Sequence, residues 1–332
     1  MNAKELMSIL LASDEPSIRW KTRAHVLGEP VNSKAMRALQ AEIRTSTRVR
    51  TLLAGRGERS PYDKWQGCHW MLATLADIGY PAGDDALVTM RNRVFDMWLD
   101  EWFYREFAAR RKEEAYQRPG VPVMNGRHRR CASQQGSALY FLTRLGLADD
   151  RAKKLAERLL YWQWPDGGWN CDKNPAADTS SFMETMLPMC GLAVHAAATK
   201  DRSAKAAANS AAEVFLTRGL YRRRSDRRVI HPEFVSLHYP LYWHYDFLAG
   251  LKAMRVVGRI DDPRCDDALD LLESKQLPGG GWPAEKRYYK VSGRHELGAD
   301  HVDWGGTSKK RMNPWVTVDA LAVLRAAGRV SV

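Results

Sequence analysis

Two short segments of the sequence place reactive side chains close together. In Trp-Asn-Cys-Asp (169–172), Cys171 can act as a nucleophile or metal ligand and Asp172 as an acid or ligand. His244 and Asp246, two residues apart, supply a titratable base and a carboxylate. These residue types predict acid–base catalysis or a metal-assisted reaction.

Glu184 is a further candidate for proton transfer. Its neighbours Phe182, Met183, Met186 and Leu187 are apolar. Burial among them would raise the pKa of its carboxyl group and suit it to act as a general acid. The alternative is a salt bridge between Glu184 and an arginine of a neighbouring helix.

The candidate acids and bases also have a purely structural interpretation. Asp172 can accept backbone hydrogen bonds in its turn, while Trp169 packs between outer helices. Asp246 can cap a helix and His244 can donate to a backbone carbonyl. Because residues two apart on a helix do not face one another, a direct pair of His244 and Asp246 is disfavoured. Both interpretations stay open on the sequence alone.

Zinc is the candidate cofactor. Cys171, Asp172 and His244 together offer the sulfur, oxygen and nitrogen atoms that Zn²⁺ prefers. A zinc ion held there would polarise the substrate or activate water. The alternative is acid catalysis by Asp246, Asp172 or Glu184 without a metal, with His244 as base or orienting residue.

A group of aromatic and amide side chains can line a substrate pocket. Such rings can hold a planar or isoprenoid ligand, or stabilise a cation over their faces. Core packing explains the same residues equally well. The candidates are Trp65, Gln66, His69, Trp70, Gln134, Gln135, Trp169, Asn170, Tyr242, Tyr245 and Trp315.

The elements that must position these residues repeat along the chain. Four apolar stretches end in a glycine that suits the left-handed position after a helix, namely Gly79, Gly146, Gly258 and Gly328. Acidic pairs follow three of these glycines and can cap a second, more charged helix. The pattern therefore predicts helix–turn–helix pairs.

Two Gly-Trp turns support the same repeat. Segments 163–169 and 276–282 read Gln-Trp-Pro-Asp-Gly-Gly-Trp and Gln-Leu-Pro-Gly-Gly-Gly-Trp, and they lie 113 residues apart. This spacing suits two repeats of roughly 55 residues, with a degenerate middle copy at 216–221. Stacked helix pairs of this length bury a continuous core, which predicts a helical toroid or solenoid.

The predicted fold class is all-α, an (α/α) barrel of inner and outer helices. The more apolar first helices should line the inside and the charged second helices the outside. Inner helices are expected at 62–78, 131–145, 178–197, 243–257 and 314–327. Helices near 3–12, 16–27 and 33–54 would cap or complete the ring. We thus expect N-terminal helices in 1–55 and the toroid in 56–332, as one continuous domain, with 283–313 as an excursion or lid.

Composition and charge exclude several classes of protein. The 332 residues are 45% hydrophobic and 27% charged, which argues against a disordered chain. No apolar run is long enough to predict a membrane span, and the N-terminus is typical of a first helix rather than a signal peptide. Five scattered cysteines predict free thiols and a cytoplasmic location.

The net charge of +12 permits an anionic partner. Segment 222–228 holds five arginines in seven residues and can bind phosphate, or can be a solvated loop. No nucleic-acid motif accompanies it, so a nucleic-acid partner is not expected. Segment 127–130 precedes a predicted inner helix and can reach an anionic ligand at the helix N-terminus.

The Gly-Trp turns resemble the QW-type repeats of the squalene cyclase and protein prenyltransferase β-subunit superfamily. More narrowly, the chain looks like bacterial squalene-cyclase-like proteins. The matching stretches are Lys64–Trp70, Ser133–Leu139, Pro165–Asp172, Ser180–Thr185, Tyr242–Asp246 and Asn313–Thr317. The resemblance implies an (α/α) barrel with a central cavity. The sequence departs from it in lacking the Asp-x-Asp-Asp motif of cyclases and the Asp-Asp-x-x-Asp motif of magnesium-dependent terpene synthases.

Three functions follow as hypotheses. The first is a cyclase-, isomerase- or transferase-like enzyme that acts on a small hydrophobic or aromatic-bound substrate by acid–base or zinc-assisted chemistry. The second is a non-catalytic ligand-binding barrel, which the missing acid motif favours. The third is a carbohydrate-active (α/α) toroid working on an acidic sugar, by analogy of fold alone. The sequence predicts neither the substrate nor the oligomeric state.

Overall fold

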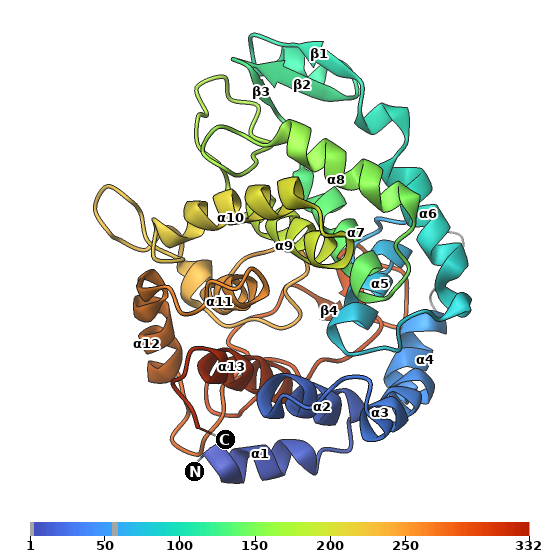
Figure 1. Cartoon of the computed structure of the whole chain (residues 1–332), viewed down its shortest axis with the longest axis vertical. Helices are drawn as coiled ribbons and strands as arrows, with labels where there is room; N and C mark the ends of the chain where they lie inside the picture. Colours follow the sequence, from blue (N-terminus) through green and yellow to red (C-terminus); the bar gives the residue numbers. More distant parts are fainter. Residues whose placement is uncertain (1–2, 55–58, 332) are drawn as a thin grey trace. The chain divides into compact units, whose positions relative to one another are not determined.

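The fold is built mainly from α-helices in the computed structural model, which describes residues 3–54 and 59–331 (Figure 1). The all-α prediction is confirmed. Contacts within the backbone divide the chain into two compact units. Unit 1 comprises Met1–Gly83 and Arg218–Val332, and unit 2 comprises Asp84–Thr217. The predicted boundary at 55/56 lies outside the described residues, and the single continuous domain stays a prediction.

Unit 2 is a set of helices that pack in pairs. Helices α7 and α9 make the most extensive contact, and α8 and α10 pack against them (Figure 1). Helix α7 is buried over most of its length, whereas α8 exposes its charged residues, as the inner and outer assignments predicted. The helices are α6 (Val88–Trp98), α7 (Ala132–Arg144), α8 (Asp150–Trp162), α9 (Phe182–Thr199) and α10 (Arg202–Leu216).

The contact between α7 and α9 depends on small residues. An added Cβ at Gly136 would lie 2.3 Å from the backbone nitrogen of Pro188, and one at Gly191 would lie 2.5 Å from the carbonyl oxygen of Gly136. Pro188 has no N–H, so the carbonyl of Glu184 one turn earlier lacks the usual helical donor there. The two backbones can approach this closely only because side chains are missing at the crossing.

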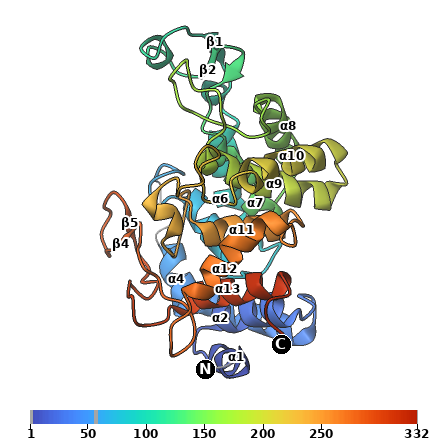
Figure 2. The ribbon, with the colours of Figure 1, turned by 90° about the vertical axis from the view of Figure 1, so that its left-hand side faces the viewer.

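Unit 1 stacks its helices in successive layers. Figure 2 shows α11, α13, α2 and α1 one beyond the next, and neighbouring members of this series are in contact. The helices are α1 (Ala3–Leu11), α2 (Pro16–Lys21), a π-helix (Thr22–Leu27), α3 (Lys34–Thr45), α4 (Thr47–Ala54), α5 (Cys68–Asp77), α11 (Phe247–Val256), α12 (Asp266–Ser274) and α13 (Pro314–Ala326).

An ionic network around the buried Lys21 connects four helices of unit 1. Lys21 is 2% exposed and pairs with Asp77 at 3.1 Å and with Asp319 at 2.9 Å. Lys252 contacts both carboxylates as well, and the Tyr239 hydroxyl donates to Asp77 at 2.8 Å. Because each buried charge has several partners, the network fixes α2, α5, α11 and α13 relative to one another.

Strands are few and short in the described chain. Strands β1 (Glu106–Ala108), β2 (Val121–Met124) and β3 (Arg127–His128) form one sheet in that order, with β1 parallel and β3 antiparallel to β2. Strands β4 (Lys290–Val291) and β5 (Ala299–Asp300) pair in parallel inside the predicted lid segment. Short 3₁₀ helices complete the secondary structure at Asp85–Leu87, Glu101–Phe103, Glu114–Tyr116, Pro232–Val235 and Pro263–Cys265.

Helix ends follow the predicted signals, while several helix starts come later than predicted. The four predicted glycines all have positive φ, between 64° and 82°. Helix α11 begins at Phe247 because the carboxylate of Asp246 accepts the backbone N–H of Ala249 and caps it. Helix α9 begins at Phe182, after Ser181 in the N-cap position, and not at 178 as predicted. Residues before each cap form irregular turns, which bring the candidate side chains to the helix N-termini.

Candidate metal centre

The two Gly-Trp turns have the same local structure. The indole N–H of Trp169 donates to the carbonyl of Leu159, and its backbone N–H donates to the hydroxyl of Thr185. Trp282 makes the equivalent bonds to Leu272 and Thr317. Each turn is therefore tied backward to the preceding outer helix and forward to the first turn of the next inner helix.

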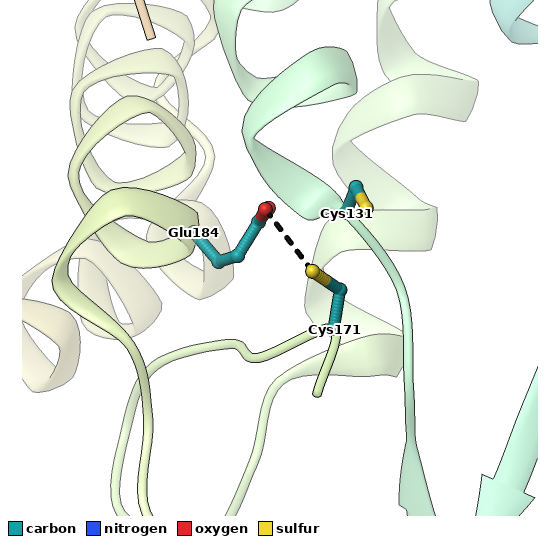
Figure 3. A group of neighbouring side chains, drawn as sticks. All are labelled: Cys131, Cys171 and Glu184. Atoms are coloured by element: carbon teal, nitrogen blue, oxygen red, sulfur yellow. Dashed lines mark hydrogen bonds between the residues drawn. The ribbon is translucent and has the colours of Figure 1, made fainter. Parts of the chain in front are cut away.

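This geometry delivers Cys171 to the start of α9. Cys171 follows the Trp169 turn, and Glu184 projects from the first turn of α9. Cys131 occupies the N-cap position of α7. Figure 3 shows the three side chains converging from these separate segments. One ligand atom from each, the two sulfurs and a carboxylate oxygen, all lie within 4.8 Å of one another.

Hydrogen bonds orient Glu184 within the cluster. Its Oε1 accepts from the Cys171 thiol at 3.3 Å, and its Oε2 accepts the backbone N–H of Ser133 at 3.0 Å. Ser133 lies in the first turn of α7, whose positive end stabilises an anion. Glu184 therefore bridges the N-terminus of α7 to the segment that carries Cys171.

The pKa values of the three groups are shifted from their ordinary values, two upward and one downward. Burial raises the pKa of Glu184, as predicted from its apolar neighbours, and the helix N–H of Ser133 offsets part of that effect. The neighbouring Cys171 side chain lowers the pKa of Cys131, while the neighbouring Cys131 side chain, burial and nearby negative charge raise the pKa of Cys171. Crowding of these acidic groups favours a cation among them.

The donor set suits zinc. In a tetrahedral Zn²⁺ site with bonds of about 2.3 Å to sulfur and about 2.1 Å to oxygen, neighbouring ligand atoms are roughly 3.6–3.8 Å apart. The separation of 3.3 Å between Cys171 Sγ and Glu184 Oε1 is close to that value. Two thiolates and one carboxylate also favour zinc over magnesium or calcium, which prefer oxygen ligands alone.

Two buried polar side chains of the same region have atoms without a hydrogen-bond partner within residues 3–54 and 59–331. Arg130 precedes Cys131, is 9% exposed, and leaves its Nε unpaired while Nη2 donates to Gln134. Gln135 is fully buried and neither atom of its amide finds a partner. An unpaired buried polar group costs about 1–3 kcal/mol. The first turns of α7 therefore present unused hydrogen-bonding capacity.

Asn170 and Asp172, two further candidate residues of unit 2, make hydrogen bonds within the segment that follows the Trp169 turn. Asn170 donates to the carbonyl of Thr179, and its side-chain oxygen accepts the N–H of Asp172. Asp172 is exposed and accepts the N–H of Asn174. The structural interpretation of Asp172 therefore describes its contacts, and its roles as acid or ligand stay predictions.

His244 and Asp246 belong to unit 1 and do not pair with each other. Asp246 accepts from the backbone N–H of His238 at 3.0 Å and faces His238 Nδ1 at 3.2 Å. Burial opposes protonation of His238, but the two carboxylates of Asp246 and Glu233 outweigh it and raise the pKa of His238. His244 bonds the Leu241 carbonyl, and burial lowers its pKa to about 4. His244 is therefore neutral at pH 7.

Most predicted pocket residues of unit 1 pack against one another. Trp65 stacks on Tyr242 with ring centroids 3.8 Å apart, and Trp70 lies edge-on to Trp65. The Tyr245 hydroxyl donates to the Leu220 carbonyl, and Trp315 stacks on a neighbouring tyrosine. The other two members, Gln66 and His69, are buried as well. Whether these residues bind a substrate stays a prediction.

Sequence reasoning found two of the three converging residues and missed the third. Cys171 and Glu184 were candidates, whereas Cys131 carried no motif of its own. Its signal was positional, because it is the first residue of the predicted inner helix 131–145, and in the structure it occupies the N-cap position as Asp246 does in α11. The arginine-rich segment 222–228 is partly neutralised, since Arg222 pairs with Asp267 at 3.1 Å.

Comparisons with known proteins bear on architecture only. No family model matches the chain, and no curated protein matches it. A solved structure of a UGL variant with dGlcA-Glc-Rha-Glc is similar in fold. The similarity has a TM-score of 0.43 and 13% identity, and it covers 93% of this chain and 84% of that one. UGL, an unsaturated glucuronyl hydrolase, is an α/α toroid. A likeness this distant transfers neither substrate nor reaction.

Proposed function

We propose that the chain is a zinc-dependent enzyme whose metal is held by Cys131, Cys171 and Glu184. The observation that carries the proposal is the convergence of two thiols and a carboxyl group within 4.8 Å from three separate segments. Ionisation of Cys171 and Glu184 is unfavourable without a cation, because burial and nearby negative charge oppose it, and a bound cation would reverse that effect.

The number of ligands favours a catalytic site. Structural zinc sites are closed by four protein ligands, whereas catalytic sites have three and keep one position open. The cluster comprises three residues in the part of the chain that the structure describes. Bound Zn²⁺ would supply a Lewis acid at the open position. Glu184 and the N-terminus of α7 would orient the group bound there.

Metal analysis tests the proposal directly. Protein purified under reducing conditions should hold about one zinc per chain, and Cys131→Ser, Cys171→Ser and Glu184→Gln should each lower the stoichiometry. Cys190→Ala is the matched control, because Cys190 is a buried cysteine of α9 that lies outside the cluster. Retention of zinc in all three cluster variants, or its absence from the parent protein after zinc loading, would refute the site.

A thiol redox function is the second candidate. The lowered pKa of Cys131 beside the Cys171 thiol favours it, since a thiolate next to a second thiol can exchange with a disulfide. Both thiols would lose a proton and an electron to an oxidised disulfide, which becomes two thiols. A protein without zinc that forms a Cys131–Cys171 disulfide in oxidised glutathione would support this candidate over the zinc enzyme.

The class of reaction at the site is a further part of the proposal. The resemblance to squalene-cyclase-like proteins favours an isoprenoid or other hydrophobic substrate, and the fold-level analogy favours an acidic sugar. A binding protein without catalysis is the remaining possibility. Zinc-loaded protein should be assayed with a polyprenyl compound and with an unsaturated uronic-acid oligosaccharide. Turnover that is lost in Glu184→Gln would decide between them.

A further inference from the structure

Two polar side chains beside the cluster have hydrogen-bonding groups that the described residues do not use. Arg130 immediately precedes Cys131, and its charge interacts with those of Cys131, Cys171 and Glu184. Its guanidinium lies over the ring of Phe103, with the carbon 4.8 Å from the ring centroid. The aromatic contact and the bond to Gln134 hold the group in place while Nε stays unpaired.

Gln135 lies near the start of α7, close in sequence to the metal ligand Cys131. Cys131 occupies the N-cap position and Gln135 follows it by four residues, about one helical turn into the helix. Its amide is fully buried, and within the described chain neither its NH₂ nor its oxygen is bonded. Burial of an unpaired amide is costly, so a partner that is not part of the chain would stabilise it.

We propose that Arg130 and Gln135 form the binding site for a carboxylate-bearing small molecule whose other end reaches the metal centre. This inference rests on the proposed zinc site and names the class of its substrate. A planar carboxylate matches the parallel N–H donors of a guanidinium. The NH₂ of Gln135 would donate to the same anion, and its oxygen would accept from a neighbouring hydroxyl or N–H group of the ligand.

The charge of the centre is consistent with an anionic ligand. Zn²⁺ with two thiolates and a carboxylate has one formal negative charge, which Arg130 neutralises. Lys173 is a further cation, since its charge interacts with those of both cysteines. With Arg130 and Lys173 together, the occupied centre would be positive by one charge, and a carboxylate would neutralise it.

Cobalt-substituted protein with acetate as the probe tests the inference. Co²⁺ in a thiolate site has visible absorption bands, and acetate bound by Arg130 and Gln135 beside the open position should shift them. Arg130→Met and Gln135→Leu should each weaken acetate binding by about 10- to 100-fold, as expected for loss of a hydrogen bond to a charged group. Arg144→Met, at the exposed far end of α7, is the matched control and should bind acetate like the parent.

The outcomes separate this inference from the proposed function. Absence of the cobalt bands from the parent protein would refute the metal site and the inference with it. Intact bands with no response to acetate would overturn only the inference. So would equal acetate affinity in the parent and the two variants, or a spectral response to inorganic phosphate but not to acetate. Gln135→Leu adds no charge change, so it remains informative if Arg130→Met does not fold.

Discussion

Substitution of Gly136 by alanine tests whether the crossing of α7 and α9 builds the metal centre. The crossing holds Cys131 at the start of α7 near Glu184 in the first turn of α9. An alanine Cβ at position 136 would lie 2.3 Å from the nitrogen and 2.5 Å from the Cα of Pro188. Both contacts are with backbone, so no side-chain rotation can relieve them.

The size of the effect follows from these distances. Ordinary contacts begin at 3.4 Å, so the helices must separate by about 1 Å. Overpacking of this kind costs about 1–3 kcal/mol of the free energy of unfolding. Zinc sites tolerate about 0.2 Å of error in ligand distance, so the shift should remove one ligand. Structural zinc sites gain about 10–16 kcal/mol from four ligands, or roughly 2.5–4 kcal/mol each, so loss of one ligand here should lower zinc affinity by about 10²- to 10³-fold.

Urea unfolding and zinc titration of the Gly136→Ala protein measure both effects. Gly279→Ala is the matched control, since an added Cβ there meets nothing within 4 Å. The control should change the free energy of unfolding little and leave zinc binding intact. The reasoning is wrong if Gly136→Ala is as stable as Gly279→Ala within about 0.5 kcal/mol and binds zinc equally well.

Three further predictions concern stability. Burial lowers the pKa of His69 to about 3, so only the unfolded chain takes up a proton at this residue as the pH falls below about 6.5. The free energy of unfolding, measured with urea, should therefore fall by about 2 kcal/mol between pH 7 and pH 5, and by less in His69→Gln. The pKa of His238 is raised, so its stabilisation is present at pH 6 and lost as the pH rises through the folded pKa; His238→Gln should abolish that loss. Lys21→Met leaves Asp77 and Asp319 with Lys252 as their remaining cation, so it should cost less than the loss of an isolated buried pair, about 1–3 kcal/mol by thermal or urea unfolding; unchanged stability would contradict the ionic network.

Local sequence signals predicted the helices well. Apolar periodicity, Asp caps and terminal glycines act within a few residues, so they can be recognised in the sequence without knowledge of tertiary contacts. The helix ends at Gly146 and Gly258 follow directly from them. Helix starts were harder to predict: α5 begins at Cys68 and not at 62, because Gly67 takes the N-cap position after a turn that includes the polar residues Asp63 and Lys64.

The sequence also identified part of the site. Glu184 was a candidate because its apolar neighbours predicted burial, and burial does raise its pKa. Cys171 was a candidate because it follows the Gly-Trp turn. By contrast, the zinc ligands expected from sequence combined Cys171 with Asp172 and His244. Asp172 stays exposed in its turn, and His244 lies in unit 1.

The sequence by itself thus determined the helical class, the repeated Gly-Trp turns and two of the three converging residues, because each depends on local pattern. Only the tertiary structure brought Cys131 to Cys171 and Glu184. That proximity depends on the close crossing of α7 and α9 at Gly136 and on the anchoring of the turn at Trp169. Ligands from three separate segments meet through packing, which no single segment encodes.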